Sequence, residues 1–290
     1  MEIYRDNSGT AVLEHPVTGP LTADIMRGSE VISANQPVTS TSGKHTTNIG
    51  WALTEYDATL TVKWKKTDFE RKTYVEVVTP ILPLSELAEL LEDVPLQDQY
   101  DAESVVRRII FVYTGQSFGK FRGTNEVAGN DSTRLALPAP LLSFTDMSDG
   151  VLAYDPSGFR ITGAGWFLGQ APGAWWTIKE APPEEVLDQF SSGVIYAPGT
   201  VKKRDFSYTN IYTITGDWGY ESVPTPVVQA AKLLISDYAC QDASYRDKYL
   251  QSMKAADWRI QFTQAAYDGT GNLKADQLLE PYKLSNLVVI

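Results

Sequence analysis

The side chains best suited to acid–base chemistry are three glutamates that follow a pair of tryptophans. Trp175 and Trp176 precede Glu180, Glu184 and Glu185. Two carboxylates beside an aromatic ring are typical of a glycosidase, in which the distance between the carboxyl groups defines the reaction. Because the sequence does not fix that distance, and glutamates near tryptophan are common, an ordinary structural role is favoured.

Metal ligands and nucleophiles are few. The chain has two histidines, His15 and His45, and one cysteine, Cys240, so it contains neither a zinc-spaced cluster nor a Cys–His pair. Cys240 lies in an apolar helical pattern and is expected in a core. The loop 268–272 lacks the ligand spacing of an EF-hand. We therefore expect no catalytic residue, no metal site, no cofactor and no enzymatic activity.

The tryptophans allow a different function, the stacking of sugars on a flat aromatic surface. Trp166, Trp175, Trp176 and Trp218 all lie in a stretch rich in strand-forming residues. Aromatic residues in strands belong more often to a core than to a binding face. A carbohydrate-binding module of a phage or bacterial surface protein is therefore the alternative function.

The composition predicts a folded chain that neither crosses a membrane nor wraps DNA. Hydrophobic residues make up 43% of the 290 residues, and no apolar run is long enough for a spanning helix. The first residues lack the pattern of a signal peptide. The net charge of −11 excludes tight binding to phosphates. It fits either simple solubility or the wall of a channel through which DNA passes without sticking.

Strand patterns come first in the chain. Leu60, Val62 and Trp64 alternate with polar residues, which indicates a strand with one buried face, and a β-rich segment follows at 73–78. The strand patterns in residues 1–80 therefore predict an N-terminal unit similar to a β-sandwich. Short apolar runs separated by turn residues predict a second β-rich region, an insertion at 126–209.

Helical patterns surround that insertion. One helix is predicted around 84–91 with Ser85 as N-cap, and a second from Asp101 to Gly115, whose wide apolar face indicates burial on more than one side. Thr225 and Pro226 begin a third, in which Val227, Ala230, Ala231, Leu234 and Tyr238 share a face. The expected divisions are residues 1–80, 81–125, 126–209, 210–270 and 271–290.

Three segments resemble the head–tail adaptor (connector, or head-completion) family of tailed bacteriophages. The first is 84–91, followed by a helix that ends in Tyr113–Phe118 and is similar to the family's YTGQxF. The second is Ile214–Tyr220, before the third helix. The third, Ala256–Phe262 and Leu278–Lys283, is similar to a "GD" strand and an LLxPYR close. The resemblance covers roughly 84–125 and 210–290, and it departs at Ala256, where a Gly is usual, and in the inserted β region.

The resemblance implies an α+β fold: a small helical bundle with an N-terminal β-sandwich-like unit, a β-rich insertion and an extended C-terminal arm. The bundle core would consist of Leu87, Leu91, Val106, Ile109, Ile110, Tyr113, Val227, Ala231 and Leu234. The arm, which the apolar chain end favours, would dock on the portal through Pro281, Tyr282, Lys283, Leu284, Leu287, Val288 and Ile290.

The resemblance also implies partners and a location. The subunits would form a ring of about twelve copies beneath the portal protein ring. A tail-side neck or tail-terminator protein would bind the other face of this ring. Genomic DNA would pass through the lumen without specific binding, and the sequence does not identify the residues that line it. The protein would be assembled in the bacterial host cytoplasm and reside in the virion neck, without contact with a membrane.

Overall fold

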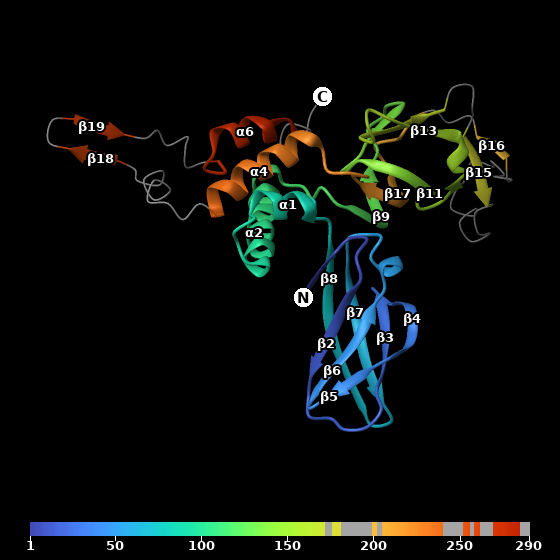
Figure 1. Cartoon of the computed structure of the whole chain (residues 1–290). Coiled ribbons are helices and arrows are strands. Elements are labelled where there is room, and N and C mark those ends of the chain that lie inside the picture. Colours follow the sequence, from blue (N-terminus) through green and yellow to red (C-terminus); the bar gives the residue numbers. More distant parts are fainter. Residues whose placement is uncertain are drawn as a thin grey trace. The chain divides into compact units, whose positions relative to one another are not determined.

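The computed structural model describes residues 1–171, 176–180, 199–201, 205–239, 252–255, 258–261 and 269–284 (Figure 1). The chain forms two compact units. Unit 1 comprises Met1–Glu55, Thr59–Gly119 and Ser222–Ile290, and unit 2 comprises Tyr56–Ala58 and Lys120–Glu221. Unit 1 thus combines the N-terminal sheets with helices from both ends of the chain.

The N-terminal part of unit 1 consists of two sheets. The five-stranded sheet has the order β1-β8-β7-β3-β4, and the three-stranded sheet has the order β2-β6-β5. Only the β1–β8 pair is parallel. The strands are β1 (Glu2–Tyr4), β2 (Gly9–Glu14), β3 (Thr22–Arg27), β4 (Glu30–Pro37), β5 (Thr39–Thr41), β6 (Lys44–Ile49), β7 (Ala58–Lys66) and β8 (Phe69–Val78). A 3-10 turn, η1 (Trp51–Leu53), follows β6.

The alternating pattern of β7 fixes which face of its sheet is buried. Leu60, Val62 and Trp64 are fully buried, whereas the residues between them are partly exposed, so the predicted strand is confirmed. Val62 lies opposite Ile25 of β3, which is also fully buried. Since a shift by one residue would turn these side chains to solvent, the burial pattern also fixes the register.

The helices of unit 1 are α1 (Leu84–Leu90), α2 (Leu96–Thr114), α4 (Thr225–Ala239) and α6 (Leu273–Leu279), with a 3-10 turn, η4 (Glu280–Tyr282), after α6. α2 contacts α1, α4 and α6. Gly115 ends α2 with a φ of 76°, as its predicted role as a left-handed cap requires. The predicted starts of the first two helices are wrong. Pro83 and Pro95 occupy the N-cap positions, and their carbonyls accept hydrogen bonds from Leu87 and Gln99.

Unit 2 contains a six-stranded sheet of order β16-β15-β12-β11-β17-β9 and a three-stranded sheet of order β10-β14-β13. Its core includes the fully buried rings of Tyr154, Phe206, Tyr212 and Trp218. The elements are β9 (Lys120–Ala128), β10 (Arg134–Ala136), β11 (Leu141–Ser148), β12 (Ala153–Tyr154), η2 (Pro156–Gly158), β13 (Phe159–Thr162), β14 (Phe167–Gln170), β15 (Trp176–Glu180), β16 (Gly199–Val201) and β17 (Ile211–Gly219). A separate hairpin, β18 (Ser252–Ala255) with β19 (Trp258–Gln261), belongs to unit 1.

The expected fold class, an α+β protein built on a small helical bundle, is wrong. In the described residues, strands occupy more of the chain than helices do. α1 and α6 are only seven residues long. The helical segments exist where the periodicity predicts them, but they form a small cluster in a mainly β protein.

Candidate functional site

The helical part of unit 1 has a buried side formed by α2, α4 and the ends of α1. Among the residues expected in a bundle core, Ile109 and Tyr113 are only half-buried. Tyr238, expected on the buried face of α4, is 45% exposed. The remaining members of the expected core are buried: Leu87, Leu91, Val106, Ile110, Val227, Ala231 and Leu234.

The opposite side of α2 carries apolar side chains that the described residues leave open. Val105 is 36% exposed, Phe111 51% and Val112 74%. A cavity of about 590 Å³ adjoins this side and is lined by Val105, Ile109 and Val112 together with Arg108 and Lys283. Exposed apolar patches of this kind mark contact surfaces. The predicted burial of α2 on more than one side is therefore not achieved within the described part of the chain.

Two segments far apart in the sequence contact each other at the end of α2. The side-chain amide of Gln116 donates a hydrogen bond to the carbonyl of Tyr282. The rings of Phe118 and Tyr282 meet edge to face, with centroids 5.7 Å apart. The Tyr113 hydroxyl donates to Glu280 over 3.1 Å. This network fixes the chain segment that follows α6.

Lys283 and Leu284 complete this contact. The Lys283 ammonium lies 4.1 Å from the centre of the Tyr113 ring and 2.8 Å from a carboxylate oxygen of Glu280. Hydrogen bonds to Glu280 and Tyr113 raise the pKa of Lys283. Leu284 packs beside Gly115. Residues 281–284 of the expected docking arm therefore fold against their own chain, and Leu287, Val288 and Ile290 lie outside the described residues.

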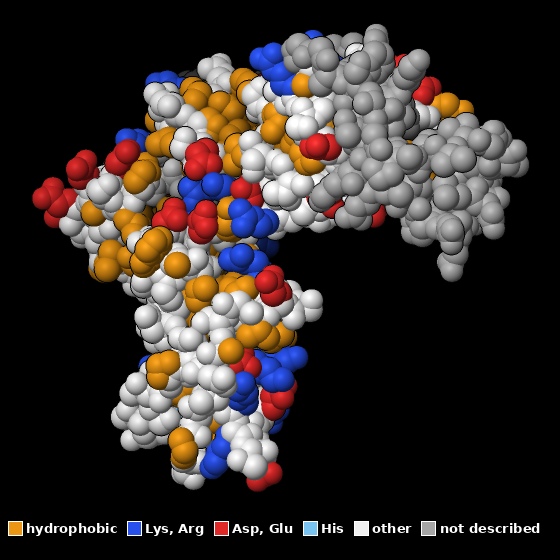
Figure 2. Space-filling view, turned by 90° about the vertical axis from the view of Figure 1, so that its right-hand side faces the viewer, with side chains coloured by type: hydrophobic (Ala, Val, Ile, Leu, Met, Phe, Trp, Pro, Cys, Tyr) orange, Lys and Arg blue, Asp and Glu red, His pale blue; other side chains and the backbone are white. Residues whose placement is uncertain are grey.

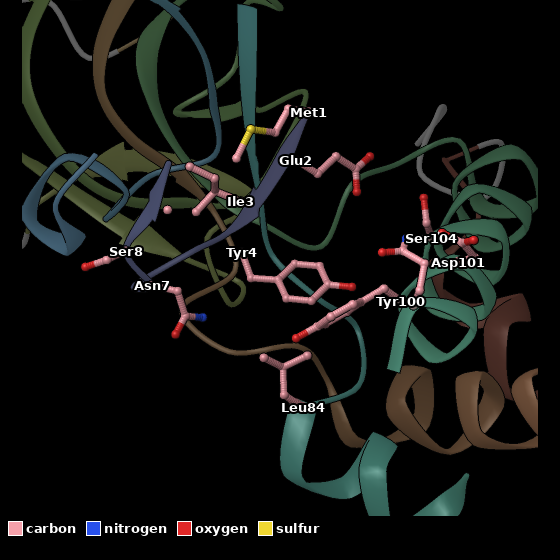
Figure 3. Close-up of a pocket in the computed structure, with 12 residues that line it drawn as sticks. Met1, Glu2, Ile3, Tyr4, Asn7, Ser8, Leu84, Tyr100, Asp101 and Ser104 are labelled. Atoms are coloured by element: carbon pink, nitrogen blue, oxygen red, sulfur yellow. Dashed lines mark hydrogen bonds between the residues drawn. The ribbon is translucent and has the colours of Figure 1, made fainter. Parts of the chain in front are cut away.

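A groove of about 640 Å³ lies between β1 and the N-terminal half of α2. Figure 3 shows Tyr4 and Tyr100 side by side across it, with Leu84 below them. Their ring centroids are 5.6 Å apart. The polar lining includes Glu2, Asp101 and Ser104, but no histidine, cysteine or lysine.

A buried ionic network lies next to this groove. Glu103 is 1% exposed and accepts hydrogen bonds from the backbone N–H of Ile81 (2.9 Å), the hydroxyl of Tyr4 (3.1 Å) and the guanidinium of Arg107 (3.3 Å). Arg107 also binds the carboxylate of Glu2 at 2.6 Å. The network thus ties β1 and the segment before α1 to α2.

Burial controls the protonation of this network. Desolvation raises the pKa of Glu103, although Arg107 and the hydrogen bonds favour the charged form. Burial and the nearby Glu103 also raise the pKa of Tyr4. A raised carboxyl pKa is a common property of catalytic acids. Here, however, all three donors bind the carboxylate and solvent does not reach it, so the arrangement anchors two elements.

The ring of His45 has a hydrogen-bond partner at each nitrogen. His45 is buried, with Nδ1 2.7 Å from the Ser40 hydroxyl and Nε2 2.9 Å from the carbonyl of His15. This is the spacing of a nucleophile and its base. A backbone carbonyl, not the carboxylate of a catalytic triad, contacts the other ring nitrogen. The contact therefore satisfies buried polar atoms within the N-terminal sheets.

The segment Ile214–Tyr220, which carries part of the family resemblance, forms β17 and has a structural explanation in unit 2. A side chain at Gly216 would place its Cβ 2.2 Å from the carbonyl oxygen of Ser143 on β11. Trp218 is fully buried, and its indole N–H donates to the carbonyl of Gly123. Trp218 is therefore unavailable for sugar stacking. Trp166 is half-buried, and the side chains of Trp175 and Trp176 lie outside the described residues.

Asp217 in the same strand belongs to a second ionic cluster. Arg122 donates to Asp217 at 2.7 Å and to the hydroxyl of Tyr56, and its guanidinium lies 4.3 Å from the centre of the Tyr56 ring. The hydrogen bond from Arg122 lowers the pKa of Asp217. Arg122 is 54% exposed, so this cluster lies at the surface of unit 2.

The loop before α6 caps that helix. The Asn272 side chain accepts from the backbone N–H groups of Lys274 and Ala275, and the Thr270 hydroxyl donates to Asp276. In the described part of the chain, no group of three or more His, Cys, Asp or Glu residues is arranged to hold a metal. Cys240, Asp268, Glu184 and Glu185 lie outside that part, as does the side chain of Glu180.

The accessible surface is mixed in character. On the face shown in Figure 2, hydrophobic side chains form separate small patches among charged ones. No helix in the described residues is both long and apolar enough to span a membrane.

Comparisons with known proteins identify no family. No family model matches the chain, and no curated protein matches it. Among solved structures, titin domain M7 is 11% identical, with 27% of this chain and 81% of that chain covered and a TM-score of 0.21. A chimeric titin Z1Z2 tandem is 9% identical, with 77% of this chain and 95% of that chain covered and a TM-score of 0.27. At these scores, neither likeness carries an argument.

Proposed function

We propose that this chain is a structural head–tail adaptor of a tailed bacteriophage. Copies of it form a ring of about twelve under the portal, join the head to the tail, and continue the DNA channel. The portal ring and a tail-side neck or tail-terminator protein are its partners. The protein is assembled in the host cytoplasm, resides at the head–tail junction, and catalyses no reaction.

The observation that carries this proposal is the contact between two of the segments that resemble the family. Tyr113–Phe118 at the end of α2 and Leu278–Lys283 at the end of α6 are separated by more than 150 residues. They nevertheless meet through the Gln116–Tyr282 hydrogen bond and the Phe118–Tyr282 ring contact. A joint structural role for these two segments favours a shared origin of the motifs over a chance likeness.

The charge of the chain supports the same function. With a net charge of −11, the protein gains little from neutralising phosphates. A channel wall must let DNA slide, so weak attraction to the backbone is an advantage there. The apolar open side of α2 supplies a surface for protein contacts, as a subunit of an assembly requires.

The contacts of residues 281–284 also bear on which part of the arm docks on the portal. Because 281–284 are held against α2, we assign portal docking to the rest of the expected arm, which contains Leu287, Val288 and Ile290. Truncation after Leu284 is expected to abolish portal binding and leave the fold intact. Truncation after Pro281 removes Tyr282 as well, so it is expected to lower the melting temperature too. Undiminished portal binding by the first truncation would contradict this assignment.

The test of the function itself is immunogold labelling of intact virions with an antibody against this chain. Gold confined to the head–tail junction is the expected result. Gold on fibres or on the outer surface would favour the carbohydrate-binding alternative. Absence of the protein from purified virions would overturn the proposal.

A further inference from the structure

The open side of α2 carries a regular series of residues at alternating spacings of three and four. We call this series the α2 seam; it consists of Asp98, Asp101, Val105, Arg108 and Val112. Alternating spacings of three and four place side chains along one line of a helix, and this line is where a second helix packs in a coiled coil. The opposite side of α2 is already buried through Ala102, Val106 and Ile110. α2 is therefore built to contact helices on two sides.

In the described residues, no helix covers the seam. Val112 is 74% exposed, and Arg108 makes neither an ion pair nor a hydrogen bond within the described part of the chain. Hollows border the seam at both ends. The groove beside β1 includes Asp101, and the cavity beside η4 includes Val105, Arg108 and Val112.

We propose that the seam binds the α2 seam of a second copy of this chain, with the two helices antiparallel about a two-fold axis near Val105. The order of charges along the seam selects this occupant. Both aspartates lie in the N-terminal half and Arg108 lies in the C-terminal half. An antiparallel pair therefore sets Asp101 of each copy against Arg108 of the other, whereas a parallel pair sets like charges together.

The apolar residue at the centre of the seam fits the same arrangement. Val105 lies between Asp101 and Arg108 and meets its own copy at the axis. Val112, seven residues further along, lies opposite Asp98 of the partner helix, so the apolar contact is confined to the axis. A two-fold contact is self-complementary, so each surface occurs twice and the pair is closed.

This inference goes beyond the proposed adaptor function and does not depend on it. A closed ring of identical subunits uses head-to-tail contacts, whereas a two-fold pair does not propagate. The pair is thus the form of the free protein, in which the apolar side of α2 is covered, and it opens before a ring closes. A monomeric free protein would leave the immunogold test of the adaptor function unaffected.

Charge exchange on the full-length protein tests the pairing. Analytical ultracentrifugation over a range of concentrations is expected to show a wild-type dimer of the 32.1 kDa chain. Asp101→Arg and Arg108→Asp should each weaken the dimer at least about a hundredfold, because each change creates two like-charge contacts. The double variant restores both opposite-charge pairs and should dimerise again. Arg160→Asp, a reversal of an exposed charge in unit 2, is the control and should change nothing.

Disulfide trapping tests the orientation, and circular dichroism shows that each variant is folded. In a Cys240→Ala background, Val105→Cys should cross-link under mild oxidation, because the two positions meet at the axis. Val112→Cys should not, although Val112 is more exposed, because its two copies lie about 20 Å apart along antiparallel helices. A wild-type protein that stays monomeric, a double variant no tighter than the single ones, or equal cross-linking at both positions would overturn the proposal.

Discussion

Each of the two units contains a cluster of a carboxylate, an arginine and a tyrosine, and the clusters differ in their exposure to solvent. In unit 1, Glu103 is 1% exposed and binds Arg107 and Tyr4. In unit 2, Asp217 binds Arg122, which is 54% exposed. The same three groups thus occur once inside a protein interior and once at a surface.

The pKa values of the two carboxylates move in opposite directions. Desolvation outweighs the neighbouring charge at Glu103 and raises its pKa, whereas the hydrogen bond from Arg122 outweighs desolvation at Asp217 and lowers its pKa. Burial therefore decides whether the charged form of the carboxylate is disfavoured or favoured beside an arginine. It also decides what remains when one partner is removed: a buried charge without a partner, or a hydrated one.

Replacement of Glu103 is expected to have the largest effect. Glu103→Leu leaves Nε of Arg107, the Tyr4 hydroxyl and the N–H of Ile81 without their acceptor in a buried site, although Arg107 keeps its ion pair with Glu2. The loss should be about 3–5 kcal/mol in the free energy of unfolding, measured by urea denaturation. Glu89→Leu makes the same chemical change at an exposed position of α1 and should cost less than about 0.5 kcal/mol. Equal costs would show that burial does not set the contribution of Glu103.

The pH dependence gives the second prediction. A carboxyl whose pKa is raised in the folded state stabilises the fold below its unfolded pKa, near pH 4, and this contribution is lost as the pH rises through the folded value. Glu103→Gln has no such titration. The stability of the wild type minus that of Glu103→Gln should therefore fall as the pH rises from 4 to 7. Urea denaturation at each pH measures this difference, and a flat or rising curve would contradict the raised pKa.

The sequence predicts the secondary-structure elements better than it predicts either of the two ionic clusters. The alternation at Leu60, Val62 and Trp64 depends only on neighbours in one strand, and β7 is formed as predicted. Gly115 ends α2 for a local reason as well. Glu103, by contrast, gains its role from Ile81 and Tyr4, which lie in other elements. The only local signal was a glutamate within the apolar face formed by Ala102 and Val106.

The helical-bundle prediction failed for a related reason. Periodicity identifies a helix and its apolar sides, but it does not say how many helices surround it. The two apolar sides of α2 indicated a bundle, yet the described residues cover only one of them, and Val105 and Val112 stay exposed. The apolar chain end predicted a segment that either docks back on its own domain or inserts into a partner, and the sequence did not decide between the two. The contacts of Tyr282 with Gln116 and Phe118 were not readable from spacing.

Removal of the surface carboxylate should have the smallest effect. Asp217→Asn keeps the size of the side chain and removes the charge that faces Arg122. Since Arg122 is more than half exposed, the cost at pH 7 should be below about 1 kcal/mol, and it should shrink at high salt.

The lowered pKa of Asp217 stabilises the fold above the unfolded value, near pH 4, and this contribution is lost as the pH falls through the folded value. The cost of Asp217→Asn should therefore decrease in acid, opposite to the trend for Glu103→Gln. Urea denaturation of Asp217→Asn, Arg122→Gln and the double variant gives the coupling energy between the two side chains. A coupling energy of several kcal/mol would show that the surface cluster contributes as much to the stability of the fold as the buried one.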